Sequence, residues 1–250
     1  MHPAIHLKDK LTRSELVLGI MVVDHLWLEL IEVAINAGLD YLIVDTEHQS
    51  RNGEFVADVC RLGRMAHFPV LLRPQRTDTE SIGLAMDLGP CGLLLPMVES
   101  AEQLDGVRDG IYMPPRGKRR PGGAGNRWVT KFNYEAFKAE IEDHVVILPQ
   151  IESRLGLENA TAIAEHEITT ALAVGPFDLS AQLGVCGDNS HVKQQEALGQ
   201  IRKAAQQAEK PAWIIGNAEE LVRQGYHFIC IGEPTAVLEA TLKNMVSQLR

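Results

Sequence analysis

The chain alternates short apolar runs with longer segments in which apolar residues recur at helical spacing. Runs of this kind, rich in Val, Ile and Leu and flanked by Gly, Pro or Asp, are typical of strands buried in a parallel sheet. We predict strands at Leu16–Val23, Tyr41–Val44, Pro69–Arg73, Gly92–Pro96, Val145–Glu152, Thr170–Pro176, Pro211–Ile215 and His227–Ile231.

The segments between these runs have helical periodicity, with one exception. Residues Thr77–Glu80 have the form of a capping box, which marks the start of a helix. The stretch from Glu99 to Asn133 lacks strong periodicity and is predicted to be a long loop, of the kind that is usually functional or disordered. We predict helices at 1–15, Leu26–Ala37, Glu54–Ala66, Thr77–Leu88, Tyr134–Asp143, Leu157–Ala164, Gln194–Glu209, Ala218–Gln224 and Thr235–Leu249.

Strands that alternate with helices along the whole chain, with no break in composition, predict an α/β fold with a single (β/α)₈ barrel (a TIM barrel). A domain of roughly 250 residues is the usual size for this architecture. We therefore expect residues 1–250 to form one barrel domain. A doubly wound open sheet is the alternative, but it would normally use fewer strands or carry a second domain.

Composition narrows the possible partners. The formal net charge is −9, which argues against nucleic acid because phosphate binding requires a basic surface. No run of 18 apolar residues and no signal-peptide pattern is present, so we predict a cytoplasmic protein that does not enter a membrane. Cys60, Cys91, Cys186 and Cys230 show no C-x-x-C spacing and are expected to be buried, reduced thiols.

Polar residues with catalytic potential follow several of the predicted strands. In a (β/α)₈ barrel the loops after the strands carry the chemistry, because all the strands end at the same face. The most informative stretch is Tyr41–His48, in which an apolar strand leads directly into two acids and an imidazole; taken alone, a helix cap at Asp45 explains it about equally well. The residues at or just after the strand ends include Asp45, Glu47, His48, Arg73, Gln150, Glu152, Gly175, Pro176, Phe177 and Asp178.

Glu152 and Asp178 are the best metal candidates. One or two carboxylates, with the remaining coordination left to water and substrate, is how proteins usually hold Mg²⁺ or Mn²⁺. Each acid alone is more often a helix cap or a surface charge, but the two follow neighbouring strands. No strand end supplies the lysine that an imine-forming aldolase needs, so a barrel acting on carbonyl compounds would use a metal as its electrophile. Gly123-Ala-Gly125 is only a weak match to a dinucleotide-binding turn.

Two further features leave alternatives open. Asp87 falls in the last turn of a predicted helix, where an acid opposes the helix dipole, so it is either a solvated acid or a group that orients a buried histidine. The basic segment Arg116–Arg127 fits an exposed linker, a nucleic-acid patch or a lid over an anionic substrate. The net negative charge makes the nucleic-acid interpretation the weakest of the three.

Six motifs taken in order resemble those of the HpcH/HpaI aldolase family, the metal-dependent (class II) pyruvate aldolases. The resemblance covers roughly residues 16–235. Two positions depart from the family pattern: Gly19-Ile-Met-Val lacks the usual tryptophan, and Arg120-Pro121 replaces the glycine that commonly follows the loop arginine. The motifs are Gly38–His48, Leu72–Pro74, Leu94–Ser100, Pro114–Gly117, Gln150–Glu152 and Gly175–Ser180.

This resemblance implies a divalent cation, Mg²⁺, Mn²⁺ or Co²⁺, ligated by Glu152 and Asp178. The cation would chelate the carboxylate and keto oxygens of pyruvate or a related 2-oxo acid such as hydroxypyruvate. Arg73 would stabilise the enolate. Gln150 and the backbone of Gly175, Pro176 and Phe177 would position the carboxylate.

The resemblance also implies how the proton moves. His48, oriented by Asp45 and Asp87, would act as general acid or base, and Glu47 would support the site or its subunit contacts. The reaction would be reversible aldol addition of the 2-oxo acid to an aldehyde, and in the other direction cleavage of 4-hydroxy-2-oxo acids. A homo-oligomer, typically a hexamer, is expected, with the C-terminal helix packed between subunits and arginine-rich loops reaching neighbouring sites.

Three alternatives to a pyruvate aldolase remain at this level. An acyl-CoA thioester lyase on a related barrel would need a nucleotide-binding extension, which the chain does not show. A metal-dependent oxaloacetate decarboxylase or a citrate-synthase-like condensing enzyme would use the same enolate. A non-catalytic barrel would not be expected to gather acids, a histidine and an arginine at one mouth.

Overall fold

The computed structural model describes residues 1–49, 51–120, 122–123, 127–129 and 132–250. Its strands form one closed barrel in the order β1 to β8, with every neighbouring pair parallel, which confirms the predicted (β/α)₈ architecture and excludes the open sheet. The strands are β1 (Val17–Val22), β2 (Tyr41–Asp45), β3 (Val70–Arg73), β4 (Gly92–Leu95), β5 (Val146–Ile151), β6 (Leu172–Val174), β7 (Ala212–Ile215) and β8 (Phe228–Cys230).

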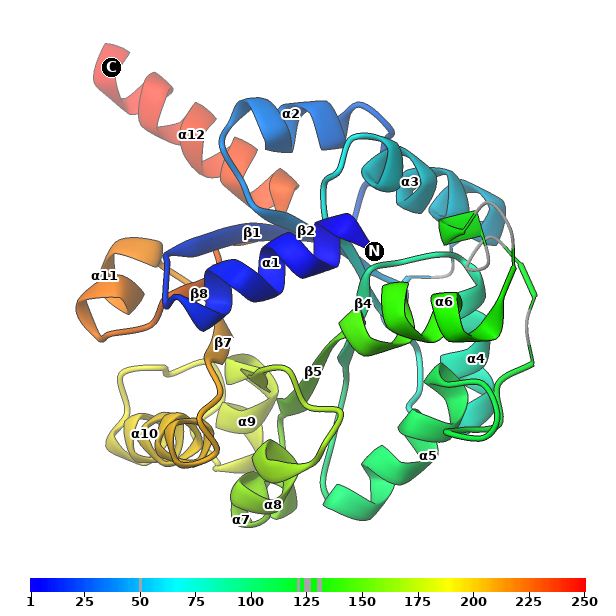
Figure 1. The fold of residues 1–250 in the computed structure, drawn as a ribbon. Helices are drawn as coiled ribbons and strands as arrows, with labels where there is room; N and C mark the ends of the chain where they lie inside the picture. The colour runs from blue at the N-terminus through cyan, green and yellow to red at the C-terminus, as the bar shows by residue number, and fades with distance from the viewer. Residues whose placement is uncertain (50, 121, 124–126, 130–131) are drawn as a thin grey trace.

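Helices surround the barrel, and α1 lies across one of its ends (Figure 1). The predicted N-terminal helix is present as α1 (His2–Thr12). The others are α2 (Leu30–Asn36), α3 (Gly53–Met65), α4 (Thr79–Asp87), α5 (Ala101–Ile111), α6 (Tyr134–Glu140), a 3₁₀ turn η2 (Glu142–His144), α7 (Arg154–Glu158), α8 (Ala160–Glu165), α9 (Pro176–Gln182), α10 (Val192–Gln207), α11 (Ala218–Arg223) and α12 (Pro234–Leu249).

The barrel interior is filled by side chains rather than left as a pore. Trp213 on β7 donates a hydrogen bond from its indole Nε1 to the Tyr41 hydroxyl at 2.8 Å, and the Tyr41 ring packs edge-on against Phe228. The aromatic ring of Tyr41 occupies space that only a glycine at position 19 leaves open, since a Cβ there would lie 2.3 Å from the ring. The packing of these side chains, together with the backbone hydrogen bonds between strands, therefore fixes the strand register.

The segment predicted to be a long loop contains a regular helix, so that prediction was wrong over its first part. Helix α5 begins after Ser100, whose hydroxyl accepts a hydrogen bond from the Gln103 amide. Its buried positions Leu104, Val107 and Ile111 recur at helical spacing. Two glycines and several charged residues dilute this pattern in the sequence, but burial against α4 stabilises the helix.

Smaller differences concern helix ends. The cap of α4 is Asp78 rather than Thr77, because the Asp78 carboxylate accepts hydrogen bonds from the Ser81 amide and hydroxyl. The single helix predicted at Leu157–Ala164 is divided into α7 and α8 at Asn159. Helix α9, which carries Asp178, was not predicted.

All four cysteines are free, and three of them are buried as expected; Cys186 is exposed. In the part of the chain that the structure describes, no helix combines the length and apolar character needed to span a bilayer.

Candidate active site at the carboxyl ends of the strands

Asp45 is a buried carboxylate that orients the neighbouring residues of the candidate site. It ends β2 and is fully buried, and its carboxylate accepts hydrogen bonds from the amides of Glu47 (3.0 Å) and His48 (3.3 Å). A short turn stabilised in this way is a common use of an aspartate at the end of a strand. The turn sets the direction in which the Glu47 and His48 side chains leave the barrel.

Arg73 holds the same carboxylate from the neighbouring strand. It ends β3 in direct register with Asp45, is only 5% exposed, and places its Nε 2.7 Å from Asp45 Oδ1 and 3.2 Å from Glu47 Oε2. Burial by itself would lower the pKa of Arg73, but the hydrogen bond and charge of Asp45 together with the charge of Glu47 raise it. Arg73 is therefore a permanent, oriented cation at the mouth.

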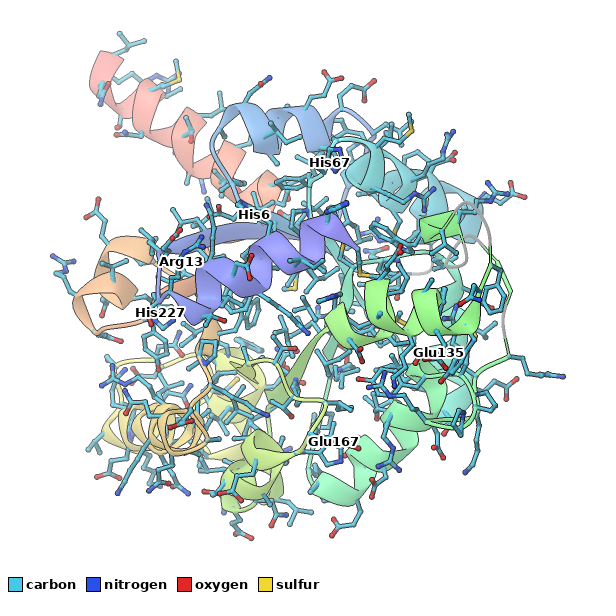
Figure 2. All side chains as sticks on the ribbon, viewed as in Figure 1. His6, Arg13, His67, Glu135, Glu167 and His227 are labelled. Carbon is cyan, nitrogen blue, oxygen red and sulfur yellow. The ribbon has the colours of Figure 1, made fainter. Side chains whose placement is uncertain are left out.

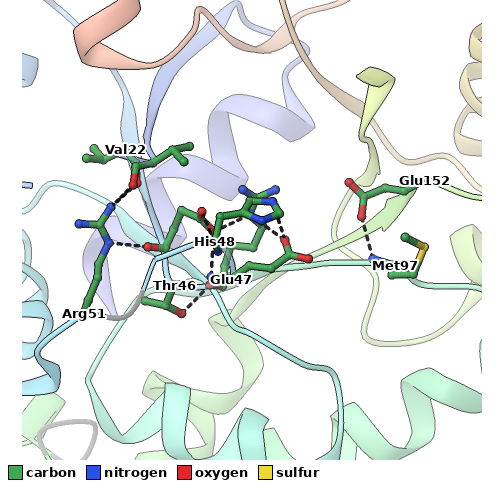
Figure 3. A network of polar contacts seen from close by, with 10 residues as sticks. Val22, Thr46, Glu47, His48, Arg51, Met97 and Glu152 are labelled. Carbon is green, nitrogen blue, oxygen red and sulfur yellow. Dashed lines mark hydrogen bonds and ion pairs between the residues drawn. The ribbon is translucent and has the colours of Figure 1, made fainter. Parts of the chain in front are cut away.

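His48 is the most accessible group of this cluster. Its imidazole Nε2 lies 3.6 Å from Glu47 Oε2, and its side chain is 55% exposed (Figure 3). Burial raises the pKa of Glu47, while Arg73 and His48 act in the opposite direction. Asp45 thus positions His48 through the backbone, whereas Glu47 is the carboxylate that approaches its ring.

Arg51 ties the end of β2 to the end of β1. Its guanidinium donates to the carbonyl oxygens of Asp45 (2.5 Å), Val22 (3.2 Å) and Val23 (2.5 Å) (Figure 3). This residue was not predicted to belong to the site. Nothing in the sequence distinguishes an arginine that binds three carbonyl groups from one that lies in solvent.

Glu152 lies on the other side of the mouth, just after β5. It is 3% exposed, and its Oε2 accepts a hydrogen bond from the Met97 amide at 2.9 Å. Burial raises the pKa of Glu152 to about 7, helped by the negative charges of Glu47 and Asp178 and opposed by the Met97 amide and by Arg73. Met97 has a positive φ of 49°, an uncommon conformation for this residue type, which accompanies its contact with Glu152.

Gly175 leaves the space that the Glu152 carboxylate occupies. A Cβ at position 175 would lie 2.1 Å from Glu152 Oε1, so no larger residue fits without displacing the carboxylate. Gly175 caps α9, which begins with Pro176, Phe177 and Asp178. Phe177 and Asp178 are both exposed to solvent at this mouth.

The donor set at the mouth fits a divalent cation. Glu47, Glu152 and Asp178 influence one another electrostatically, and Arg73 is the cation that offsets them. Gln150 is 3% exposed, and its side-chain Oε1 is buried without a hydrogen-bond partner. Over the described ranges no three His, Cys, Asp or Glu side chains meet closely enough to hold a metal ion by themselves. Glu152 and Asp178 supply carboxylate oxygens, the donors that Mg²⁺ and Mn²⁺ prefer, and leave further coordination positions to water and substrate.

Asp87 lies elsewhere. It is the last residue of α4, the helix that leads into β4, and therefore lies at the opposite end of the barrel from His48. Its Oδ1 accepts a hydrogen bond from Arg119 Nη2 at 2.7 Å. Within one chain the structure brings together Asp45, Arg73, His48, Gln150, Glu152 and Asp178, with Gly175, Pro176 and Phe177 beside them, but not Asp87.

The basic segment is bound to its own chain at several points. Arg116 contacts Glu142 at 3.3 Å and Asp143 at 2.7 Å, and Lys118 contacts Asp109 at 2.6 Å. Pro121 and residues 124–126 fall outside the described residues. Arg116 and Lys118 are thus engaged in ion pairs that anchor this part of the segment beside η2 and α5.

Comparisons with known proteins agree on one family. A profile of the HpcH/HpaI aldolase/citrate lyase family matches residues 27–239. The chain is 31% identical to a hydroxypyruvate/pyruvate aldolase from Pseudomonas aeruginosa, over 99% of this chain and 94% of that protein. It is 30% identical to a 2-keto-3-deoxy-L-rhamnonate aldolase from Klebsiella pneumoniae, over 97% and 92%. The crystal structure of an HpcH/HpaI aldolase from Desulfitobacterium hafniense superposes with a TM-score of 0.87 at 27% identity, covering 96% of this chain and 95% of that one.

Proposed function

Since the chain belongs to the HpcH/HpaI aldolase/citrate lyase family, it is a carbon–carbon lyase, and we propose that it is a divalent-metal-dependent aldolase. Its donor is pyruvate or a related 2-oxo acid such as hydroxypyruvate, its acceptor is an aldehyde, and the reverse reaction cleaves 4-hydroxy-2-oxo acids. The relatives named as hydroxypyruvate/pyruvate and 2-keto-3-deoxy-L-rhamnonate aldolases support this reaction class over decarboxylation or thioester cleavage.

The observation that carries the proposal is the excess of negative charge at the mouth. Glu152 is buried beside Glu47 and Asp178, and its pKa of about 7 reflects how poorly this environment tolerates its ionised form. A cation held by Glu152 and Asp178 would remove that cost, and Mg²⁺, Mn²⁺ or Co²⁺ fits such oxygen donors. When bound, the metal would supply Lewis acidity toward the carboxylate and keto oxygens of the 2-oxo acid.

Arg73 would stabilise the enolate, and His48 would transfer the proton. The Arg73 guanidinium, fixed by Asp45 and Glu47, stabilises the negative charge that develops on the keto oxygen when the methyl proton leaves. The exposed imidazole of His48 takes up that proton and returns it to the aldehyde oxygen after carbon–carbon bond formation. Asp45 and Glu47 orient the loop and the ring on which this transfer depends.

Gln150 and the start of α9 position the substrate carboxylate. The Gln150 side chain lies on the inner face of the barrel at the end of β5, and the backbone of Gly175, Pro176 and Phe177 borders Glu152. The exposed Phe177 ring extends from this border toward solvent, where an aldehyde would enter.

The proposal is tested by following exchange of pyruvate's methyl protons with D₂O by NMR, with Mg²⁺, Mn²⁺ or Co²⁺ and with a chelator. This experiment requires no knowledge of the aldehyde. We expect exchange that depends on metal and is lost in Glu152→Ala and His48→Ala. A His48→Ala variant with unchanged metal affinity and no exchange would separate proton transfer from binding. Absence of exchange with every metal would reject pyruvate as the donor.

We further propose that the chain assembles as a homo-oligomer, a hexamer, through α12. This helix projects away from the barrel (Figure 1), and one side of it exposes large apolar side chains, with Leu242 51% and Met245 56% exposed. Where a terminal barrel helix would normally pack, a groove beside β1 and α11 exposes Leu16 and Val222. The apolar side of α12 from a second copy fits this groove.

The same assembly would give Asp87 its role. Because Asp87 lies far from His48 in its own chain, we propose that it orients His48 of a neighbouring subunit, with Arg119 holding it in place. Leu242→Glu is expected to reduce the mass measured by light scattering and to lower activity with it. An unchanged mass would reject α12 as the subunit contact, and full activity in a monomer would reject the role of Asp87.

A further inference from the structure

A cavity lies at the end of the barrel opposite the candidate active site. Its volume is about 500 Å³, and it is bordered by α1, the end of α3, and the segments before β5. Figure 2 views this face, which α1 crosses with His6 and Arg13, and shows His67 beside it. The polar residues that line the cavity are His2, Arg64, His67, Trp128, Glu140 and His144.

Arg64 has no acidic partner in the described part of the chain. It occupies the last turn of α3, with its guanidinium carbon 5.4 Å from the centre of the Trp128 ring. Its Nη1 is buried, yet it donates to no atom of the described residues. Arg61, one turn earlier on the same helix, does have an acidic partner: it is half exposed and lies 3.0 Å from Asp58.

The surroundings of Arg64 are also positively charged. Burial lowers the pKa of Arg64, and the nearby cations Arg127 and Arg61 lower it further, with the thiols Cys60 and Cys91 acting against them. The indole Nε1 of Trp128 is a second buried donor that lacks a partner among the described residues. Glu140 is the one carboxylate among the residues that line the cavity.

We propose that this cavity is an anion-binding site in which Arg64 and Trp128 bind a phosphate or carboxylate group. A guanidinium matches the paired oxygens of either group, and an indole N–H can only donate, so both unpartnered groups require an acceptor. The imidazoles of His2, His67 and His144 add further donors around the rim. These histidines do not form a metal site, since no three metal-binding side chains cluster among the residues that the structure describes.

The cavity is larger than a single oxyanion, so the ligand is a small metabolite that carries the oxyanion as one of its groups. None of the residues involved lies at the mouth where the aldolase chemistry is proposed. The proposed aldolase chemistry assigns no role to Arg64 or Trp128, so this inference goes beyond the proposed function.

Inorganic phosphate is the first probe, measured by isothermal titration calorimetry on the full chain at constant ionic strength set with NaCl. We expect saturable binding that weakens at least about tenfold in Arg64→Gln and is unchanged in Arg61→Gln, the control from the same helix. Equal binding by wild type and Arg64→Gln, or no phosphate binding beyond that of chloride, would overturn the proposal.

Trp128→Phe provides a second test if Arg64→Gln fails to fold. It keeps an aromatic ring beneath the guanidinium but removes the indole donor, and we expect affinity for phosphate to fall a few-fold. Acetate in place of phosphate distinguishes the source: binding of phosphate alone indicates a phosphorylated ligand, and binding of acetate as well indicates a carboxylate. Either result supports the site when it depends on Arg64, and binding that survives both substitutions rejects it.

Discussion

At the two ends of the barrel, the groups that lack a compensating charge are of opposite sign. At the carboxyl ends of the strands, the acids Asp45, Glu47, Glu152 and Asp178 lie around the guanidinium of Arg73. At the other end, the unpaired guanidinium of Arg64 lines one cavity, and Lys8 and Lys210 line another. A partly buried group without a compensating charge is costly, so each end is best stabilised by a ligand of the sign that it lacks.

The difference arises from the backbone at each end. The acids at the mouth follow strands, where loops are free to carry functional groups. The cations at the other end surround the last turns of the helices, whose carbonyl groups attract positive charge. Lys8 and Lys210 illustrate this, since each donates to a main-chain carbonyl, of Asp143 and His166 respectively. Arg64 is the exception, because it donates to no described carbonyl.

We expect the largest effect on activity from a substitution that removes negative charge from the mouth of the barrel. Glu152→Gln removes a charge but retains the shape of the side chain, and we expect metal-dependent exchange of pyruvate protons to fall roughly 10²- to 10³-fold. Glu158→Gln, at an exposed acid on α7, is the control and should leave the rate unchanged. A Glu152→Gln enzyme as active as wild type would mean that this carboxylate does not hold the cation.

A smaller effect is expected from Gly175→Ala, which adds one methyl group where Glu152 lies. The new Cβ would have to displace the Glu152 carboxylate, and we expect affinity for Mn²⁺ to fall about 10- to 100-fold, as for other changes beside metal ligands. Gly199→Ala is the matched control, because a Cβ at that position meets nothing within 4 Å. Calorimetric titration with Mn²⁺ measures both variants, and equal affinities would contradict the packing argument.

The pH dependence of stability should differ in sign between the two ends. The folded-state pKa of Glu152, about 7, lies above the ordinary value of 4.5, so its stabilising contribution is complete below pH 4.5 and is lost as pH rises through 7. In chelator, Glu152→Gln should therefore be more stable than wild type at pH 8 by about 1–3 kcal/mol, and not at pH 4.5. Urea unfolding at both pH values measures this, and a parallel pH profile for the two proteins would reject it.

Lys8 should give the opposite and smallest change. Burial lowers the pKa of Lys8 to about 8 from 10.5, against the effect of Asp143, so wild type gains stability as pH rises from 8 toward 10.5. The gain relative to Lys8→Met should be about 1 kcal/mol. Lys10→Met is the comparison, since Lys10 is paired with Asp40 at 2.6 Å. The same pH trend in both variants would show that burial of Lys8 is not the cause.

The sequence by itself determined the architecture and most of the candidate site. Apolar runs such as Tyr41–Val44 can be buried on both faces only in a parallel sheet, and closure of that sheet brings the residues after each strand to one mouth. Asp45, Arg73 and Glu152 were identifiable for that reason, because their positions follow from where a strand ends.

The tertiary structure decided which groups actually meet. It separated Asp87 from His48, since a helix that returns toward the next strand carries its last turn to the opposite end of the barrel. It revealed Arg51 and Met97, whose roles depend on distances between loops and not on any local pattern. It also left Arg64 and Trp128 without partners. Periodicity records which face of an element is buried, whereas the pairing of charges depends on three-dimensional proximity between segments that are distant in the chain.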